Sequence, residues 1–347
     1  MGTVVLVGGA LQADNEAVFE RILEHAGPRV AIFGTASPDP AASLRKLGAA
    51  FARYGAEPEL VDITVENAAQ RAHDPEVLAR LERCGGFFFG GGDQRKITRA
   101  LLGTPALEVL RRRFAEGACV GGTSAGTAAM ADPMICGGTS LDSLLGHGDV
   151  VCFEEGLGFV GFQVDQHFLA WGRLGRLLKA LEHTACPLGV GIDENTALVV
   201  PEGGPWEVVG ASHVTFLERD SSGVHVSLLA HGDGYDPATG NFLIHPHREP
   251  IAEPLDDPCD LYSTDIFGPR ALPPFLARLA DNPAPSATGI AFRGSLEPRF
   301  SALGVKLGFH KTRQTAGYCG SPAFGERYSV VRVRTEVAPI RASIENL

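Results

Sequence analysis

Ser124 lies in the segment VGGTSAGTAAM, residues 120–130, where almost every neighbour is small. Gly122 and Gly126 flank it in a GxSxG pattern. This pattern is typical of a nucleophile elbow, a sharp turn from strand to helix that presents the serine hydroxyl and leaves no room for side chains beside it. The alternative is a turn of small residues that packs a helix onto a sheet. The pattern alone does not separate the two, so the elbow requires a strand, a helix, a base and an acid around it.

A nucleophilic serine needs a histidine to accept its proton and a further group to orient that histidine. Of the eleven histidines, His167 is the favoured base, because VDQHF ends a predicted strand. His147 lies in a glycine-rich loop, which is more typical of a solvated side chain. His245 and His247 form an HxH pair but have no third ligand at useful spacing, so we expect no metal site.

Several carboxylates could orient His167, and spacing does not choose among them. Asp165 stands two residues before His167 on an extended segment and can share a face with it. Most of the candidates have the sequence surroundings of solvated loop carboxylates. The candidates between or beside the serine and the histidine are Asp142, Asp149, Glu154, Glu155 and Asp165.

The elements before Ser124 alternate between buried strands and amphipathic helices. Strands are predicted at TVVLVGG, RVAIFG, PELVDI, GFFFGGG and ACVGG, with helices between them. Alternation of this kind predicts a parallel sheet covered by helices on both faces, with its active site at the carboxyl ends of the strands. The loops GTASPDP, GGGDQ and GTSAG all fall at that edge. The elbow therefore has the strand and the helix that it requires.

The later sequence is less regular. A helix is predicted over 169–183, followed by short strands with Gly and Asp turns. From about residue 240 the chain is irregular and rich in proline, with a helix over 272–280 and a strand over 327–335. We therefore predict a catalytic α/β domain at 1–240 and a C-terminal extension at 241–347, of unknown role and packed on the catalytic domain.

Composition limits the class of protein. The 347 residues are 44% hydrophobic, which suits a compact soluble protein of one large domain or two. The net charge of −11 argues against a nucleic-acid partner. Seven cysteines without a CxxC pair favour a reduced, cytoplasmic protein. The N-terminus lacks the features of a signal peptide, and no apolar run is long enough to span a membrane.

Four motifs resemble those of the cyanophycinases, which belong to serine peptidase family S51 with aspartyl dipeptidase (peptidase E). They are FFFGGGDQ, GGTSAGTAAM, VDQHF with arginines after it, and GIDENTALVV, in this order within residues 1–240. The resemblance implies a three-layer α/β/α sandwich similar to class I glutamine amidotransferases. It also implies Ser124 as nucleophile, His167 as base and Asp142 as acid. Asp142 is implied because it closely follows the run MICGGTS, at a position where the family carries glutamate. The 43 residues from Ser124 to His167 argue against an α/β-hydrolase esterase, whose histidine follows much later.

The resemblance further implies an oxyanion hole and a substrate pocket. The oxyanion would be bound by the backbone N–H groups of Gly92 and Ala125. The pocket would be lined by Gln94, Asp165, Gln166, Arg173 and Arg176, with Trp171 where cyanophycinases carry another arginine. The alternative for the arginines is a solvated helix face. We prefer the pocket, because an aspartyl substrate carries carboxylates that arginine can hold in bidentate fashion. Asp193 and Glu194 in GIDEN could cap a turn or hold those arginines.

The activity that follows is acyl transfer to water without a metal or organic cofactor. The implied substrate is cyanophycin, a polyaspartate carrying arginine on each β-carboxyl, cut to β-Asp-Arg dipeptides. The alternatives are a related hydrolase of aspartyl or isoaspartyl dipeptides or another small amide, and an amidotransferase-like binding protein without turnover. The expected partner is thus a peptide or polymer substrate, with no nucleic acid and no membrane, and the resemblance suggests a homodimer.

Overall fold

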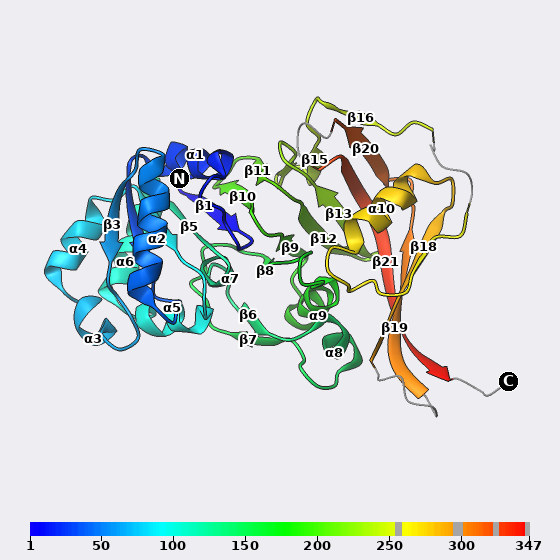
Figure 1. Cartoon of the computed structure of the whole chain (residues 1–347), viewed down its shortest axis with the longest axis horizontal. Coiled ribbons are helices and arrows are strands. Elements are labelled where there is room, and N and C mark those ends of the chain that lie inside the picture. The colour runs from blue at the N-terminus through cyan, green and yellow to red at the C-terminus, as the bar shows by residue number, and fades with distance from the viewer. Residues whose placement is uncertain (254–258, 294–300, 322–325, 344–347) are drawn as a thin grey trace.

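Two large β-sheets lie side by side and make up most of the molecule (Figure 1). The computed structural model describes residues 1–253, 259–293, 301–321 and 326–343. The first sheet and its helices hold the N-terminal half of the chain, and the C-terminal strands build the far side of the second sheet. Both sheets contribute to the edge where the predicted site residues lie.

The first sheet is mixed. Five parallel strands stand in the order β3 (Glu57–Val61), β2 (Arg29–Phe33), β4 (Gly86–Phe89), β5 (Cys119–Thr123) and β1 (Thr3–Val7). Beyond β1 the sheet continues antiparallel through β10 (Thr196–Pro201), β11 (Trp206–Gly210), β14 (Gly234–Asp236) and β15 (Asn241–Leu243). The parallel strands confirm the alternation seen in the sequence, and the antiparallel strands add to it.

Helices cover both faces of these parallel strands because each strand is apolar on both sides. Val4 and Leu6 of β1 enter one core, and Val5 and Val7 enter the other. The first core is covered by α3 (Ala68–Arg71), α4 (Pro75–Glu82), α5 (Gln94–Leu101), α6 (Pro105–Ala115) and α7 (Ala125–Ala128), and the second by α1 (Glu16–Ala26) and α2 (Pro40–Arg53). Helix α4 begins with Asp74 as its N-cap, whose side chain accepts from the Glu76 N–H, and with Pro75 in the first turn.

The second sheet joins strands from distant parts of the chain. Its order is β8 (Gln163–Gln166), β9 (Leu188–Ile192), β12 (Val214–Asp220), β13 (Gly223–Leu229), β21 (Tyr328–Ser343), β19 (Ser301–His310), β18 (Ser286–Arg293) and β17 (Tyr262–Ser263). Strand β21 also pairs with β20 (Ala316–Gly320), and β20 with β16 (Arg248–Pro250). The helices α9 (Leu174–Thr184) and α10 (Leu272–Asp281) share one apolar core with the strands of this sheet. The remaining elements are β6 (Met134–Gly137), α8 (Ser140–Leu145) and β7 (Cys152–Glu154).

Residues after 240 therefore contain much more regular structure than their sequence predicts. The helix expected at 272–280 and the strand expected at 327–335 are both present, as α10 and β21. Strand β21 pairs with β13, so the segments before and after residue 240 share one sheet.

The two sheets meet at the carboxyl end of β1. The His167 N–H, just after β8, donates to the Gly8 carbonyl (2.7 Å), and the Asn195 N–H, just after β9, donates to the Gly9 carbonyl (2.8 Å). His167 follows a strand end, as the sequence indicates, but that strand belongs to the second sheet and not to the sheet that carries Ser124. The junction brings the two together.

Candidate active site

Ser124 occupies the sharp turn from β5 to α7. Its backbone has φ 56° and ψ −111°, a left-handed conformation that is strained for a residue with a side chain. The glycines of the motif are needed for space: a Cβ on Gly126 would lie 2.3 Å from the Phe89 carbonyl oxygen, and one on Gly122 would lie 2.7 Å from Gly126. The strand, the turn and the helix expected around Ser124 are all present.

His167 faces Ser124 across the junction of the sheets. The distance from Ser124 Oγ to His167 Nε2 is 2.8 Å. Gly9 makes this approach possible, because a Cβ there would lie 2.2 Å from the imidazole ring. The sequence analysis did not single out Gly9, although GG directly after the first strand was a signal for a close backbone approach.

Glu194 is the carboxylate that contacts His167, at 2.8 Å between Nδ1 and Oε1. The contact follows from strand register. Strands β8 and β9 are parallel neighbours in which Gln166 pairs with Ile192, so the residues just after each strand lie side by side. The sequence leaves two roles open for Glu194, which are to cap a turn or to hold the arginines. The structure instead places its carboxylate against His167.

Asp142, the acid implied by the resemblance, lies elsewhere. It is in the first turn of α8, accepts a hydrogen bond from the Asp149 N–H (3.0 Å) and pairs with Arg293 at 3.5 Å. The assignment of Asp142 is therefore corrected on geometry. The assignment rested on the position of Asp142 after the run MICGGTS, whereas the carboxylate that contacts His167 comes from the segment after the neighbouring parallel strand.

Asp193 holds the turn that follows His167. It is fully buried, and its carboxylate accepts from the Ala170 N–H and from the Ser212 hydroxyl, each at 2.8 Å. Arg270 approaches the same carboxylate at 3.7 Å. Of the two roles left open for Asp193, the structure thus favours the turn.

Gly92 and Ala125 both lie beside Ser124. Ala125 follows Ser124 in sequence and is fully buried. Gly92 and Ser124 both line a cavity of about 420 Å³. Gly92 has φ +141°, and a Cβ there would lie 2.0 Å from the Ala36 carbonyl oxygen. The preceding Gly91 is in contact range of the Ser124 side chain, since its ideal Cβ would lie 3.2 Å from that of Ser124. The turn at 90–92 is thus fixed against the serine.

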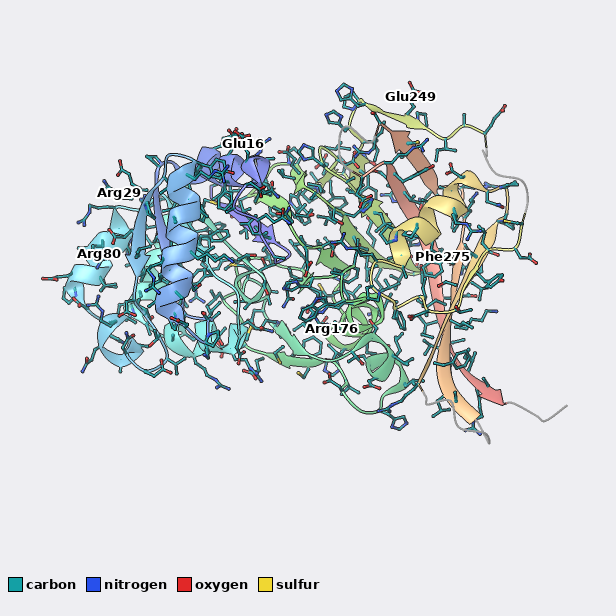
Figure 2. All side chains as sticks on the ribbon, viewed as in Figure 1. Glu16, Arg29, Arg80, Arg176, Glu249 and Phe275 are labelled. Atoms are coloured by element: carbon teal, nitrogen blue, oxygen red, sulfur yellow. The ribbon has the colours of Figure 1, made fainter. Side chains whose placement is uncertain are left out.

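Two arginines converge at the other end of this cavity. Arg176 forms a bidentate ion pair with Asp165, and Arg173 lies 3.3 Å from the same carboxylate. Burial lowers the pKa of Arg173 to about 10, so it stays protonated at neutral pH. The two guanidinium groups share the Asp165 carboxylate, and Asp149 also lines the cavity, so its wall carries charges of both signs. Figure 2 labels Arg176 near the middle of the molecule.

Asp165 does not itself line the cavity, because it is fully buried under the arginines. We had placed it among the residues that contact the substrate, and the structure makes it the support of Arg173 and Arg176. Gln94 and Gln166 do line the cavity, as expected, and the Gln94 amide donates to the Ile135 carbonyl at 2.9 Å.

Trp171 lies in the turn before α9, not within a helix as the sequence pattern predicts. Its ring stacks on the His167 imidazole, with ring centres 4.7 Å apart and planes 19° apart. The Arg173 guanidinium also lies over the Trp171 ring, with its carbon 4.4 Å from the ring centre. Trp171 remains 59% exposed and lines the cavity, so it can meet a ligand.

Cys136 also lines the cavity and was missed in the sequence analysis. Its Sγ lies 3.1 Å from that of Cys152 across the β6–β7 pair. Burial and the hydrogen bond with Cys152 raise the pKa of Cys136 to about 12, so its thiol is neutral at physiological pH.

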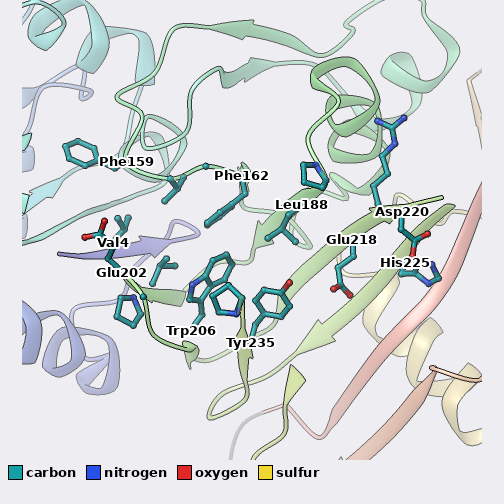
Figure 3. A pocket seen from close by; sticks show the side chains of 18 of the residues that line it. Val4, Phe159, Phe162, Leu188, Glu202, Trp206, Glu218, Asp220, His225 and Tyr235 are labelled. Atoms are coloured by element: carbon teal, nitrogen blue, oxygen red, sulfur yellow. Dashed lines mark ion pairs between the residues drawn. The ribbon is translucent and has the colours of Figure 1, made fainter. Parts of the chain in front are cut away.

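A larger cavity, of about 780 Å³, lies at the opposite ends of the strands (Figure 3). Val4 and Leu188, near the amino ends of β1 and β9, line it together with Trp206 and Tyr235. Ser124 and His167 follow the carboxyl ends of β5 and β8, the parallel neighbours of β1 and β9, and they do not line this cavity. Size alone therefore does not mark the reactive site.

No helix in the described ranges is long and apolar enough to cross a membrane. Over the same residues, no group of three or more His, Cys, Asp and Glu side chains converges to hold a metal.

The fold and the site are those of an α/β peptidase, and residues 4–205 match Peptidase family S51. The chain belongs to this family. A cyanophycinase of Synechococcus elongatus is 35% identical over 242 residues, which cover 68% of this chain and 73% of that protein. A cyanophycinase of Geminocystis herdmanii is 32% identical over 260 residues, covering 68% and 94%. The fold is also similar to the crystal structure of a peptidase from an acI-B1 Actinobacterium (TM-score 0.53, 21% identity, 68% of this chain and 97% of that one).

Proposed function

We propose that this protein is a serine peptidase that hydrolyses cyanophycin to β-Asp-Arg dipeptides. The observation that carries the proposal is the continuous contact from Ser124 Oγ through the His167 imidazole to Glu194, with 2.8 Å at each step. Curated relatives that are 32–35% identical to this chain are cyanophycinases.

The first step of the mechanism depends on which ring nitrogen of neutral His167 carries the proton. A carboxylate can only accept, so the Nδ1–H of neutral His167 donates to Glu194 and leaves Nε2 free to accept the Ser124 proton. Ser124 Oγ attacks the peptide carbonyl, and His167 then protonates the leaving amine. Water repeats the cycle on the acyl-enzyme, with His167 as base and then as acid. Glu194 orients the imidazole and stabilises its charged form.

The turn at Ser124 acts in this mechanism as a nucleophile elbow. The backbone N–H groups of Ala125 and Gly92 bind the oxyanion, because one follows the nucleophile directly and the other lies in the turn packed against it. The parallel strands with helices on both faces form the sandwich of class I glutamine amidotransferases. The strands β17 to β21, which lie after residue 240, complete the second sheet and are part of the catalytic unit.

The substrate carboxylate is held by Arg173 and Arg176. The buried Asp165 carboxylate contacts both guanidinium groups and balances the charge of one of them. A bidentate guanidinium suits the aspartyl backbone carboxylate of the polymer. Gln94 and Gln166 line the same wall and supply amide groups to the ligand.

A second candidate is a relative that acts on aspartyl or isoaspartyl dipeptides. Trp171 favours it, because an indole stands where the family resemblance implies a further arginine. One cation fewer reduces the attraction to a polyanionic backbone, while a flat ring can stack on a guanidinium or on a small ligand.

Product analysis tests the two against each other. Purified full-length protein is incubated with cyanophycin, with Asp-Xaa and isoaspartyl dipeptides and with small amides, and the products are identified by mass spectrometry. We expect β-Asp-Arg from cyanophycin as the main product. Turnover of dipeptides without polymer cleavage would establish the second candidate, and no turnover of any of them would leave a binding protein.

The proposal includes a cytoplasmic location, catalysis without a cofactor, and a homodimer. Light scattering coupled to size-exclusion chromatography tests the homodimer by measuring the mass of the assembly. The expected mass is twice that of the 36.6 kDa chain.

A further inference from the structure

A separate cavity of about 380 Å³ lies between α10 and the second sheet. We call it the α10 cavity. His213, Asp281 and Glu326 line it together with apolar side chains such as Leu228, and Arg270 and Arg278 also line it. None of these residues lines the cavity of Ser124. The volume is within the range of small-molecule sites, roughly 300–1,000 Å³.

His213 presents a hydrogen-bond acceptor to this cavity. Its ring is 2% exposed, and Nε2 lies 3.0 Å from the Tyr328 carbonyl oxygen, so Nε2 must carry the proton. Burial lowers the pKa of His213, which keeps the ring neutral. Nδ1 is therefore an acceptor, and it has no hydrogen-bond partner within the described part of the chain. The nearby Glu326 carboxylate, at 4.0 Å, is itself an acceptor.

Asp281 presents a second unmatched acceptor. It is the last residue of α10 and is 8% exposed, and its buried Oδ1 has no partner among the residues described. Lys311 acts on Asp281 electrostatically, but its ammonium donates to the Asn282 carbonyl. The Tyr328 side chain hydrogen-bonds to the Asp281 carboxylate, so Oδ1 is the atom of this group that lacks a donor. Two buried acceptor atoms without donors at one cavity are unusual, because such atoms are nearly always paired in folded proteins.

The charge pattern defines the ligand that would pair them. His213 Nδ1 and Asp281 Oδ1 lack donors, and Glu326 adds a partly exposed carboxylate. A guanidinium offers five N–H donors in one plane. Arg270 and Arg278 are exposed on the same cavity and suit a carboxylate. We propose that the α10 cavity binds free arginine or a small peptide ending in arginine, with the guanidinium inside and the carboxylate at the exposed arginines.

The cavity is connected to the reaction through Arg270. That side chain also pairs with Asp193, the residue before Glu194, and Asp193 fixes the turn after His167. A ligand carboxylate would compete with Asp193 for Arg270. Binding of a ligand in the α10 cavity would therefore change the contacts of the turn that follows His167. An arginyl product would then regulate its own formation. This link rests on the proposed function, whereas binding of arginine does not.

Calorimetric titration of the full-length protein tests the site with three probes. L-Arginine is compared with citrulline, which replaces the guanidinium by an uncharged urea, and with agmatine, which lacks the carboxylate. We expect arginine to bind and both analogues to bind about tenfold more weakly or worse, as expected for a lost charged hydrogen bond. Asp281→Asn should weaken arginine binding by a similar factor, while Gln94→Ala, in the catalytic cavity, should leave it unchanged.

The outcomes are distinct. No arginine binding at millimolar concentration, or equal binding of arginine and citrulline, would overturn the proposal. So would binding that survives Asp281→Asn and is lost in Gln94→Ala, because arginine would then occupy the catalytic cavity. If thermal melting shows that Asp281→Asn is unfolded, Glu326→Gln takes its place with the same expectation. A failure to hydrolyse cyanophycin would leave this titration unaffected, so the two proposals fail separately.

Discussion

At the scale of the residue, three side chains far apart in sequence form one line of contacts, from Ser124 through His167 to Glu194. Ser124 has a local signal, because its turn needs small residues on both sides. His167 follows a strand, which is also a local pattern. Glu194 is 27 residues further along, and it reaches His167 only because β8 and β9 are neighbours in register. Pairing of strands distant in sequence leaves no local trace in a single chain.

Replacing the two candidate acids separates them. Glu194→Gln should lower kcat by roughly 10³–10⁴-fold with little change in KM, because the amide no longer stabilises the protonated imidazole. Asp142→Asn, which changes a group that contacts Asp149 and Arg293, should keep kcat within a few-fold. Steady-state kinetics of both variants decide. The reverse order of effects would restore Asp142 and reject the contact described here.

Trp171 should set substrate preference. Its ring lies between His167 and Arg173, and such a cation–π contact contributes ~0.5–2 kcal/mol. Trp171→Arg should raise kcat/KM on cyanophycin relative to aspartyl dipeptides, since it adds a cation to the wall. Trp171→Ala should mainly raise KM. A ratio between polymer and dipeptide that is equal in all three proteins would make Trp171 a packing residue only.

At the scale of the element, the sequence predicts the first five strands well and the second sheet poorly. Apolar runs such as GFFF and regular helix starts with Asp and Pro indicate the parallel strands and their crossovers. The strands after residue 240 are short or interrupted by Gly and Pro. Those of the second sheet join it through β21, which pairs with β13, far away in sequence. Their stability comes from tertiary contacts, so their sequence carries a weak signal.

The turn at Ser124 should tolerate no added methyl group. Gly126→Ala places a Cβ 2.3 Å from the Phe89 carbonyl, so we expect a loss of about 1–3 kcal/mol in the free energy of unfolding, together with reduced kcat. Gly161→Ala is the matched control, because no atom lies within 4 Å of its ideal Cβ. Urea denaturation measures both. Equal stability of the two variants would show that the turn has room to spare.

At the scale of the whole molecule, the reactive groups come from two sheets that meet at one edge. Ser124 ends β5 of the first sheet, while His167 and Glu194 follow β8 and β9 of the second. Composition and helix–strand alternation predict the α/β class, which the structure confirms. They do not predict the second sheet, because the sequence gives no measure of which distant strands will pair.

Truncation after residue 240 tests how far the catalytic unit extends. Removing β21 would expose the edge of β13 and the core around Val226 and Leu228, because Val333 of β21, which pairs with Val226, would be lost. We expect residues 1–240 to lose cooperative unfolding and activity, because β13 and β12 link that edge to β9. Circular dichroism during thermal melting, with the full chain as reference, gives the answer. A truncated chain with a sharp transition and full activity would establish an independent domain at 1–240.

The central claim is that Ser124, activated by His167, cleaves cyanophycin. The most direct measurement is the release of β-Asp-Arg from cyanophycin by the wild-type protein and by Ser124→Ala, quantified by mass spectrometry at equal concentrations of folded protein. Because the substitution removes only the hydroxyl oxygen that lies 2.8 Å from His167 Nε2, the fold should be retained. We predict dipeptide release by the wild type and a loss of roughly 10³-fold or more in the variant. Release by Ser124→Ala at more than about a tenth of the wild-type rate, far above what loss of a nucleophile permits, would contradict the claim.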